Sequence, residues 1–297
     1  MRLEDLKMFT SIVKAGSLHG AAQGAGITQS AMTKAVQRLE LEFGVQLLNR
    51  SRRGIELTAA GQALTARTMQ LEMSVDDLRT EMLAIKSAES GLVRIGTIPA
   101  VLESTLIPVL ATCRQRKPDI HFQVRAQTSA QLIAQLQAGE LDLAICLAPE
   151  SIPEEVQAEH IALLRHHIVC RRGHPMADGG NLEMLSRADW LLPPQDVAIR
   201  LSIQGFFAKA GFPLPRPCIE ADGSQAWYAE LLRQTDMVTI FTELMLSRHR
   251  QHLQALPFAA IPLTRDLHIF YRRAAYMSPS VQEVRQLVKQ HAAAARH

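Results

Sequence analysis

The chain has 297 residues, of which 47% are apolar, 21% charged and 5% aromatic, and its formal net charge is +3. This length and composition predict about two globular domains and exclude a disordered, a collagen-like or a disulfide-stapled miniprotein. The longest uncharged stretch, residues 15–33, is rich in Gly, Ser, Thr and Gln, so it does not predict a membrane span.

The N-terminus and the cysteines both indicate a cytoplasmic protein. Glu4, Asp5 and Lys7 lie in an apolar periodic segment, without the basic, apolar and cleavage regions of a signal peptide. The four cysteines are widely spaced and form no CxxC pair, so they predict free thiols in a reducing compartment. They are Cys113, Cys146, Cys170 and Cys218. We therefore expect no membrane contact, no metal site and no cofactor.

The positive charge is concentrated at one end. Residues 1–60 hold eight Lys and Arg against five Asp and Glu, whereas the remaining residues hold 24 of each sign. The densest basic cluster is Arg50, Arg52 and Arg53. Such a cluster is the electrostatic footprint that a polyanion such as DNA requires, although a solvated basic loop is the alternative.

Local signals predict three short helices at the N-terminus. Apolar residues recur at spacings of three and four over Leu3–Val13, and Gly16 ends this helix. Ser17 is a good N-cap for a second helix through about Gly24, and Thr28 is a good N-cap for a third.

The third helix is expected to end near Phe43, with one apolar and one polar side. The apolar residues are Met32, Val36, Leu39 and Phe43, and the polar residues are Gln29, Ser30, Thr33, Lys34 and Gln37. Two short helices joined by a tight turn after a first helix are typical of a helix-turn-helix unit. Gly44 ends the third helix, and Val45–Leu57 predicts two short strands around a turn at residues 51–54, as in a winged helix.

A long helix follows, capped by Thr58 and extending to about Ser87. Its heptad positions are Leu64, Leu71, Leu78 and Ile85, with Thr68, Val75 and Met82 at the complementary positions. This repeat predicts a helix that pairs two subunits, and the alternative is a helix packed on its own domain.

Strands and helices alternate from Gly91 onward. The predicted strands are residues 93–98, 120–125, 141–147, 161–171, 190–192, 218–221, 237–241 and 267–271. The predicted helices are residues 103–117, 130–138, 199–210, 224–233 and 280–295. This alternation predicts an α/β fold with open, mostly parallel sheets, arranged as one large sheet or as two lobes.

Many residues of the first segment resemble the LysR-type transcriptional regulators in order and spacing. Between Leu3 and Gly61 these are Ser17, Ala21, Ala22, Thr28, Gln29, Arg38, Leu39, Glu40, Gly44, Arg50, Arg53, Leu57, Thr58 and Ala60. Further along, Gly96, Pro108, Pro118, the segment GELDLAI at 139–145 and HPMA at 174–177 are similar more loosely. The sequence departs from the family at Ser30, which replaces the usual Pro, at Leu48, which replaces the usual Phe, and at Gly20 and Gly24 inside the second helix.

The resemblance implies three domains. These are a winged helix-turn-helix DNA-binding domain at 1–60, a linker and dimerisation helix at 58–88, and a two-lobed periplasmic-binding-protein-like effector-binding domain at 91–297. Lobe one would comprise about 91–163 and 266–297, and lobe two about 164–265. The expected partners are double-stranded promoter DNA, a small effector, RNA polymerase and further copies of the chain, as a homodimer that assembles into a homotetramer.

The DNA-binding candidates lie at the start of the third helix and on the wing. They are Thr28, Gln29, Ser30, Thr33, Lys34, Arg38, Arg50, Arg52 and Arg53. Residues at the N-terminus of a recognition helix contact base edges, and wing arginines contact the backbone. Three alternatives stay open: Thr28 caps the helix, Arg38 pairs with Glu42, and Arg50 forms a structural ion pair near the base of the wing.

The effector candidates lie where predicted strands end and helices begin, which is where α/β folds bind ligands. They are Thr97, Pro99, Ala100, Thr128 and Ser129 in lobe one, and Pro194, Gln195, Val197, Arg200, Phe241 and Thr242 in lobe two. Arg200 suits a carboxylate or sulfonate, so we expect a small anionic effector, and an aromatic metabolite is one candidate. Helix capping is the alternative for Thr128 and Ser129, and a surface charge is the alternative for Arg200.

No catalytic motif is convincing. GxxxxGK, GxGxxG, HExxH and GxSxG are absent, and the SxxK of Ser11 and Lys14 lies in the first helix without its partner motifs. His166, His167, Cys170 and His174 do not predict a shared metal, because His167 faces away from its neighbours on a strand. The competing classes are a transport protein, a cytosolic enzyme and, as the main alternative, a cytosolic small-molecule-binding protein without regulatory DNA binding.

Overall fold

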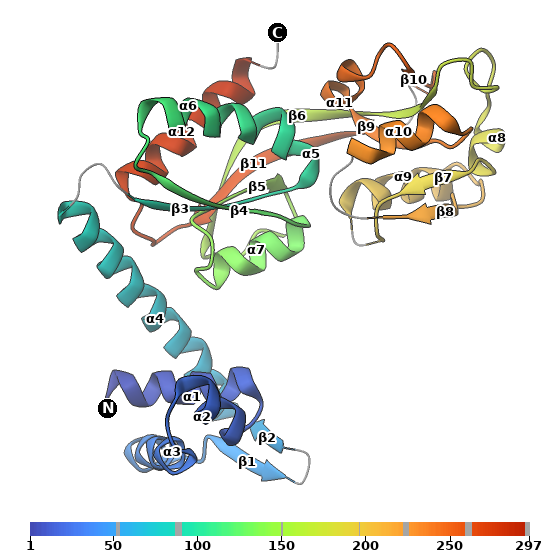
Figure 1. Ribbon diagram of the computed structural model, residues 1–297. Coiled ribbons are helices and arrows are strands. Elements are labelled where there is room, and N and C mark those ends of the chain that lie inside the picture. The colour runs from blue at the N-terminus through green and yellow to red at the C-terminus, as the bar shows by residue number, and fades with distance from the viewer. Residues whose placement is uncertain are drawn as a thin grey trace. The chain divides into compact units, whose positions relative to one another are not determined.

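The computed structural model describes residues 1–51, 54–86, 91–149, 151–195, 197–221, 226–258 and 263–294. The chain divides into two compact units, Met1–Met82 and Leu83–His297 (Figure 1). Each unit is described by itself.

Three helices build the N-terminal unit, as the local signals predict. They are α1 (Leu3–Ala15), α2 (Leu18–Ala25) and α3 (Gln29–Phe43). The hydroxyls of Ser17 and Thr28 cap α2 and α3 by accepting from the backbone N–H of Gly20 and Ala31. Their shared core contains the fully buried side chains of Phe9, Ile12, Met32 and Leu39. The helix α3 ends at Phe43 as predicted, but its buried residues end at Leu39 and Phe43 is 44% exposed.

The predicted wing is confirmed as an antiparallel pair, β1 (Leu48–Ser51) and β2 (Gly54–Leu57). Thr58 then caps the next helix, because its Oγ1 accepts from the N–H of Gly61. At Gly61 a Cβ atom would lie 2.1 Å from the carbonyl oxygen of Leu47, so only glycine allows this close approach of helix and wing.

The long helix α4 (Ala59–Lys86) is confirmed. Its predicted heptad positions, which form the seam of the helix, are buried near its start and exposed further along. Thr68 is fully buried, and Leu64 packs against the core of the N-terminal unit. Leu71, Leu78 and Met82 are about half exposed, at 46%, 55% and 50%. Nothing is described of the side chain of Ile85.

One contact joins the middle of α4 to α1. The buried Thr10 hydroxyl donates to Glu72 Oε1 at 2.8 Å, and the carbonyl oxygen of Lys7 within α1, at 3.0 Å, is the alternative acceptor of the same proton.

The C-terminal unit is an α/β domain with a seven-stranded sheet, in which six strands follow the order β10-β6-β11-β5-β3-β4 and β9 pairs with β6. The bounds are β3 (Leu92–Thr97), β4 (His121–Ala126), β5 (Leu143–Leu147), β6 (Val156–Arg171), β9 (Thr239–Thr242), β10 (Leu253–Ala255) and β11 (Thr264–Arg272). A separate pair, β7 (Trp190–Leu192) and β8 (Pro217–Glu220), is bridged to it between Trp190 and Val238.

The expectation of mostly parallel sheets is wrong. Among the described strand pairs of this unit, β3–β4, β3–β5 and β7–β8 are parallel, whereas β6 pairs antiparallel with β9, β10 and β11, and β11 pairs antiparallel with β5. The chain passes through the unit along the long strand β6 and returns beside it along β11, so the two strands run in opposite directions (Figure 1). Strand positions alone do not reveal this return path.

Helices cover the sheets and form separate cores. The first core takes its buried residues from 93–161 and 267–292 and is covered by α5 (Pro99–Val101), the π-helical turn η1 (Leu102–Leu106), α6 (Ile107–Arg116), α7 (Ser129–Gln137) and α12 (Pro279–Ala294). The second core, in two clusters, takes its residues from 168–263 and involves α8 (Leu182–Ser186), α9 (Ala198–Lys209), α10 (Ala226–Gln234) and α11 (Glu243–Arg248). The predicted lobe boundaries stay a prediction.

A membrane span is not found among the described helices, since each is too short or too polar to cross a bilayer.

Candidate nucleic-acid interface and effector region

The N-terminal end of α3 presents a polar, accessible surface. Thr28, Gln29, Ser30 and Lys34 are exposed, and Thr33 is half-buried. Of these, the Thr28 oxygen accepts the capping bond from Ala31, so the predicted capping role of Thr28 is confirmed. The other four side chains are free to meet a ligand on one side of a helix whose opposite side is packed into the core.

Arg38 holds α3 against α1. Its Nε donates to Asp5 Oδ2 at 3.0 Å, and its Nη2 pairs with Asp5 Oδ1. The bonds from Arg38 hold the pKa of the buried Asp5 carboxyl below its usual range. The alternative pairing of Arg38 with Glu42 is wrong, because Glu42 pairs with the N-terminal ammonium of Met1 at 2.7 Å.

The neighbouring Glu40 fastens α3 to the wing. Its Oε1 accepts from the backbone N–H of Leu47 at 2.8 Å and of Leu48 at 3.4 Å. Sequence reasoning missed both this bond and the Asp5 partner, since each joins residues from different elements. Asp5 was the available signal for the ion pair. It lies on the side of α1 that faces the core, and a buried carboxylate needs a cationic partner.

Of the three wing arginines, the structure describes only the backbone of Arg50. The backbone of Arg50 lies in β1 opposite Ile55, and nothing is described of its side chain. Arg52 and Arg53 lie outside the described residues. Their DNA contacts stay a prediction.

Three predicted effector residues from two distant segments meet in the C-terminal unit. Pro99 and Ala100 follow β3, Thr242 ends β9, and all three line one small cavity of about 20 Å³. Thr97, just before them, is fully buried. Glu103 and Arg248 line the same cavity and were not among the predicted residues.

The Thr128 hydroxyl has a structural role at the start of α7. It accepts from the N–H of Gln131, whose side-chain oxygen accepts in return from the Thr128 backbone, forming a capping box. The predicted alternative of helix capping is therefore confirmed for Thr128. The Ser129 hydroxyl bonds to the thiol of Cys146.

Arg200 is neither a free surface charge nor an unpaired cation. It is 2% exposed, its Nη1 donates to the carbonyl of Pro193 at 2.7 Å, and it pairs with Glu220. Its Nε has no hydrogen-bond partner among the described residues. Glu220 therefore neutralises the guanidinium and leaves one buried N–H without an acceptor.

The other predicted residues of the second core differ in accessibility. Phe241 is fully buried in β9, whereas Pro194 and Val197 are half-buried and Gln195 is exposed. Val197 precedes α9 without a side-chain cap for that helix.

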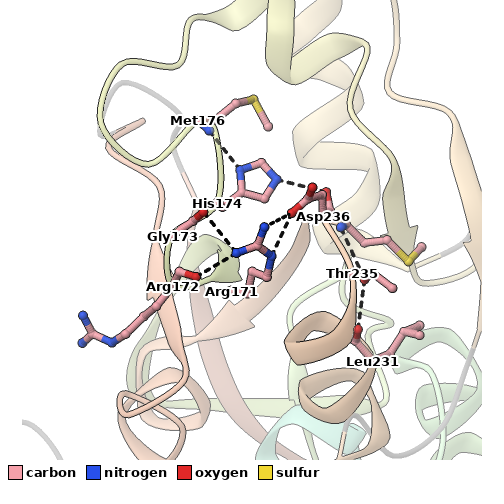
Figure 2. Close-up of polar contacts among 9 residues, drawn as sticks. Arg171, Arg172, Gly173, His174, Met176, Leu231, Thr235 and Asp236 are labelled. Atoms are coloured by element: carbon pink, nitrogen blue, oxygen red, sulfur yellow. Dashed lines mark hydrogen bonds and ion pairs between the residues drawn. The ribbon is translucent and has the colours of Figure 1, made fainter.

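The histidine and cysteine cluster is structural. Burial lowers the pKa of His166 to about 4, and its Nδ1 contacts the carbonyl of Leu263. Figure 2 shows His174 between Met176 and Asp236: Nδ1 accepts from the N–H of Met176 at 3.1 Å, so Nε2 carries the proton and donates to the Asp236 carbonyl at 3.0 Å. Within the described ranges no group of three metal-ligating side chains is found.

The buried thiols are poor nucleophiles. Burial raises the pKa of Cys146 to about 12 and of Cys170 to about 11, and it also raises the pKa of Cys113. Because only the thiolate reacts readily, these three thiols stay protonated and inert at neutral pH.

Known proteins similar to this chain cover both units. A family model described as "Bacterial regulatory helix-turn-helix protein, lysR family" matches residues 3–62, and one described as "LysR substrate binding domain" matches residues 86–293. The HTH-type transcriptional regulator GbpR of Azospirillum brasilense is 27% identical over 254 residues, which cover 82% of this chain and 72% of GbpR.

Solved structures share the fold at low identity. Full-length LysG of Corynebacterium glutamicum with bound effector Arg has a TM-score of 0.66 and 19% identity, covering 99% of both chains. Full-length CbnR complexed with its target DNA has a TM-score of 0.63 and 19% identity, covering 98% of this chain and all of that one (100%).

Proposed function

The chain belongs to the LysR family of DNA-binding transcriptional regulators with an effector-binding domain, and from this premise we propose how its own residues read DNA and respond to a small molecule. The observation that carries the proposal is the exposed polar start of α3 on a helix held at its back by the core, Asp5 and Glu40. A side chain can discriminate bases only when its helix is fixed in position.

In this proposal α3 enters the major groove with Gln29, Ser30, Thr33 and Lys34 toward the base edges. Gln pairs bidentately with adenine, Thr contacts the thymine methyl, and a good bidentate pair contributes about 1–3 kcal/mol of discrimination. Thr28 and Arg38 act beside them by capping and fixing α3. Arg50, Arg52 and Arg53 contact phosphates and supply affinity and register.

We further propose that α4 pairs two chains. Leu71, Leu78 and Met82 follow the predicted seam and are about half exposed within the chain, so a second α4 would cover them. Two helix-turn-helix units in such a dimer would contact two half-sites of a pseudo-palindromic operator. Assembly into a homotetramer and contact with RNA polymerase are supported by the family resemblance alone.

The effector is proposed to bind where segments of the first and second cores meet, near Pro99, Ala100 and Thr242. The expectation of an anionic effector rested on Arg200, which is buried and paired with Glu220 and does not line this cavity. Peroxide sensing through Cys113, Cys146 or Cys170 is disfavoured by their protonated thiols.

The test is DNA binding across a salt series, with DNA from directly upstream of the protein's own gene and from its divergently transcribed neighbour. We expect selective binding, and we expect the magnitude of the slope of log K against log salt to fall by about 2 in the Arg52→Ala/Arg53→Ala double variant. The matched control is Lys209→Gln, which removes one exposed cation at the end of α9 and should leave the slope unchanged. Absence of selective binding by folded protein would favour a small-molecule-binding protein without regulatory DNA binding.

A further inference from the structure

An ion pair joins the first and second cores beside the small cavity. Arg248 Nη1 lies 2.8 Å from Glu103 Oε2, and Arg248 Nη2 donates to the Glu103 backbone carbonyl at 3.2 Å. Glu103 lies in η1, where the neighbouring Leu102 packs on the first core, and Arg248 ends α11, whose Met245 and Leu246 belong to the second core. The pair therefore connects two segments that are anchored separately.

The cavity beside this pair is too small for a metabolite. Its volume of about 20 Å³ holds about one water molecule, and Glu103, Arg248, Ser104 and Thr242 are its polar lining. A ligand that enters must separate η1 from α11 and take over the contacts between Glu103 and Arg248. The irregular π-helical geometry of η1 is frequent at functional sites.

The charges at this seam select the ligand class. An anion that takes Arg248 leaves Glu103 without a cation, and a cation that takes Glu103 leaves Arg248 without an anion. A zwitterion supplies a partner to both. Because the side chains of Arg248 and Glu103 are 44% and 37% exposed, water screens their mutual attraction and the exchange costs little.

Space for the rest of such a ligand adjoins the pair. A groove of about 710 Å³ shares Ser104, Thr242 and Leu244 with the small cavity. Its lining combines apolar residues such as Leu163 and Leu164 with the charged side chains of Arg165, Glu243 and Arg250. We propose that the effector is a zwitterion of the α-amino-acid class, with its carboxylate on Arg248, its ammonium group on Glu103 and its side chain in this groove. This inference rests on the proposed function, because it names the chemistry of the same effector region, and it replaces the anionic class expected from Arg200 with a zwitterion held by Arg248 and Glu103.

The exchange also explains how binding would be transmitted. A ligand shifts a conformational equilibrium only by its differential affinity for the two states. With the Glu103–Arg248 contact formed, the cavity admits only water, so the zwitterion binds only the state in which the contact is replaced. Binding is thereby coupled to the separation of η1 from α11.

The experiment measures which charge class the full-length protein binds. The twenty proteinogenic amino acids are screened by thermal shift, and each hit is titrated by calorimetry together with its deamino carboxylate and its decarboxylated amine. For L-leucine, the matched probes are 4-methylpentanoate and 3-methylbutylamine. We expect at least one amino acid to bind, with both single-charge analogues about tenfold weaker or worse.

Substitutions then assign each charge. Glu103→Gln should weaken binding of the amino acid about tenfold and leave binding of the carboxylate analogue unchanged or tighter. Arg248→Gln should likewise weaken binding of the amino acid about tenfold and leave binding of the amine analogue unchanged or tighter. The exchanged pair Glu103→Arg/Arg248→Glu should restore preference for the amino acid. Glu230→Gln and Arg233→Gln, in an exposed pair within α10, are matched controls that should change none of these affinities.

Three outcomes would overturn the inference. These are a carboxylate analogue that binds as tightly as its amino acid, an unchanged preference in Glu103→Gln, or no binding of any of the twenty up to about 10 mM by protein that still binds DNA. Failure of the proposed function is distinguishable, because it would appear as absent selective DNA binding in the salt series. In each variant, an unchanged unfolding temperature without probe shows that the protein is folded.

Discussion

The two candidate sites of this protein are assembled over very different sequence distances. The DNA-reading candidates Gln29, Ser30, Thr33 and Lys34 lie within six residues of one helix, α3, which Thr28 caps. The effector region joins Glu103 to Arg248, which are 145 positions apart, through segments packed on separate cores. A site on one helix is specified mainly by local periodicity and caps, whereas a site at a seam exists only after the sheet has brought its segments together.

The candidate arginines behave alike in the two regions. Arg38 and Arg200 were each predicted to contact a ligand, and each is paired within the protein, with Asp5 and Glu220. One member of each pair is buried, the Asp5 carboxylate in the first and the Arg200 guanidinium in the second, and an unpaired buried charge is costly. Side-chain type alone therefore overestimates the number of cations available to a ligand.

The largest expected effect on stability comes from a substitution at the contact between α4 and the wing. Gly61→Ala places a Cβ 2.1 Å from the Leu47 carbonyl oxygen, so backbone must shift and the free energy of unfolding should fall by about 3 kcal/mol. Denaturant unfolding followed by circular dichroism measures it. A loss no larger than that of an exposed-site substitution would mean that the wing adjusts freely and that α3 is less firmly placed than we infer.

Base reading by α3 should give the next effect. Gln29→Ala should remove about 1–3 kcal/mol of discrimination at one operator position and leave binding to the other positions unchanged. Competition binding with single-base-pair operator variants measures it. Gln37→Ala is the matched control on the same helix, and equal effects of both substitutions would contradict the assignment of reading to the start of α3.

The Asp5–Arg38 pair should make the stability of the N-terminal unit depend on acid pH. The folded pKa of Asp5 lies below its unfolded value, so its contribution is present above the unfolded pKa of about 3.9 and is lost as pH falls through the folded pKa. Arg38→Met should therefore lower the unfolding temperature at pH 7, and the difference from wild type should shrink below about pH 4. A constant difference from pH 7 to pH 3 would contradict this role.

The smallest expected effect comes from replacing a glycine inside the helix α2. A Cβ at Gly24 meets no atom within 4 Å, so Gly24→Ala should raise the free energy of unfolding by about 0.5–1 kcal/mol. Gly26→Ala is the contrasting control, because φ is +65° at Gly26 and alanine is strained there. The unfolding temperature should rise in Gly24→Ala and fall in Gly26→Ala.

Much of the fold could be predicted from local patterns, and the exceptions share a cause. The strands predicted near 93–98, 141–147 and 237–241 correspond to β3, β5 and β9, and like the helices of the N-terminal unit they follow from apolar spacing and caps. The short helix α11 was not predicted, although Thr242 caps it and was a usable signal. A helix of six residues is not stable alone, and α11 forms because Met245 and Leu246 are buried in the second core.

By itself, the sequence determined the helix-turn-helix, the wing, the long helix and the strand–helix alternation, because each depends on spacing within a few turns or on one capping side chain. Only the tertiary structure decided the antiparallel course of β6 and β11, the partners of Arg38 and Arg200, and the contact of Glu103 with Arg248. These features join residues that are distant in the chain. Their energies depend on burial and on charge neighbours, which no local pattern encodes.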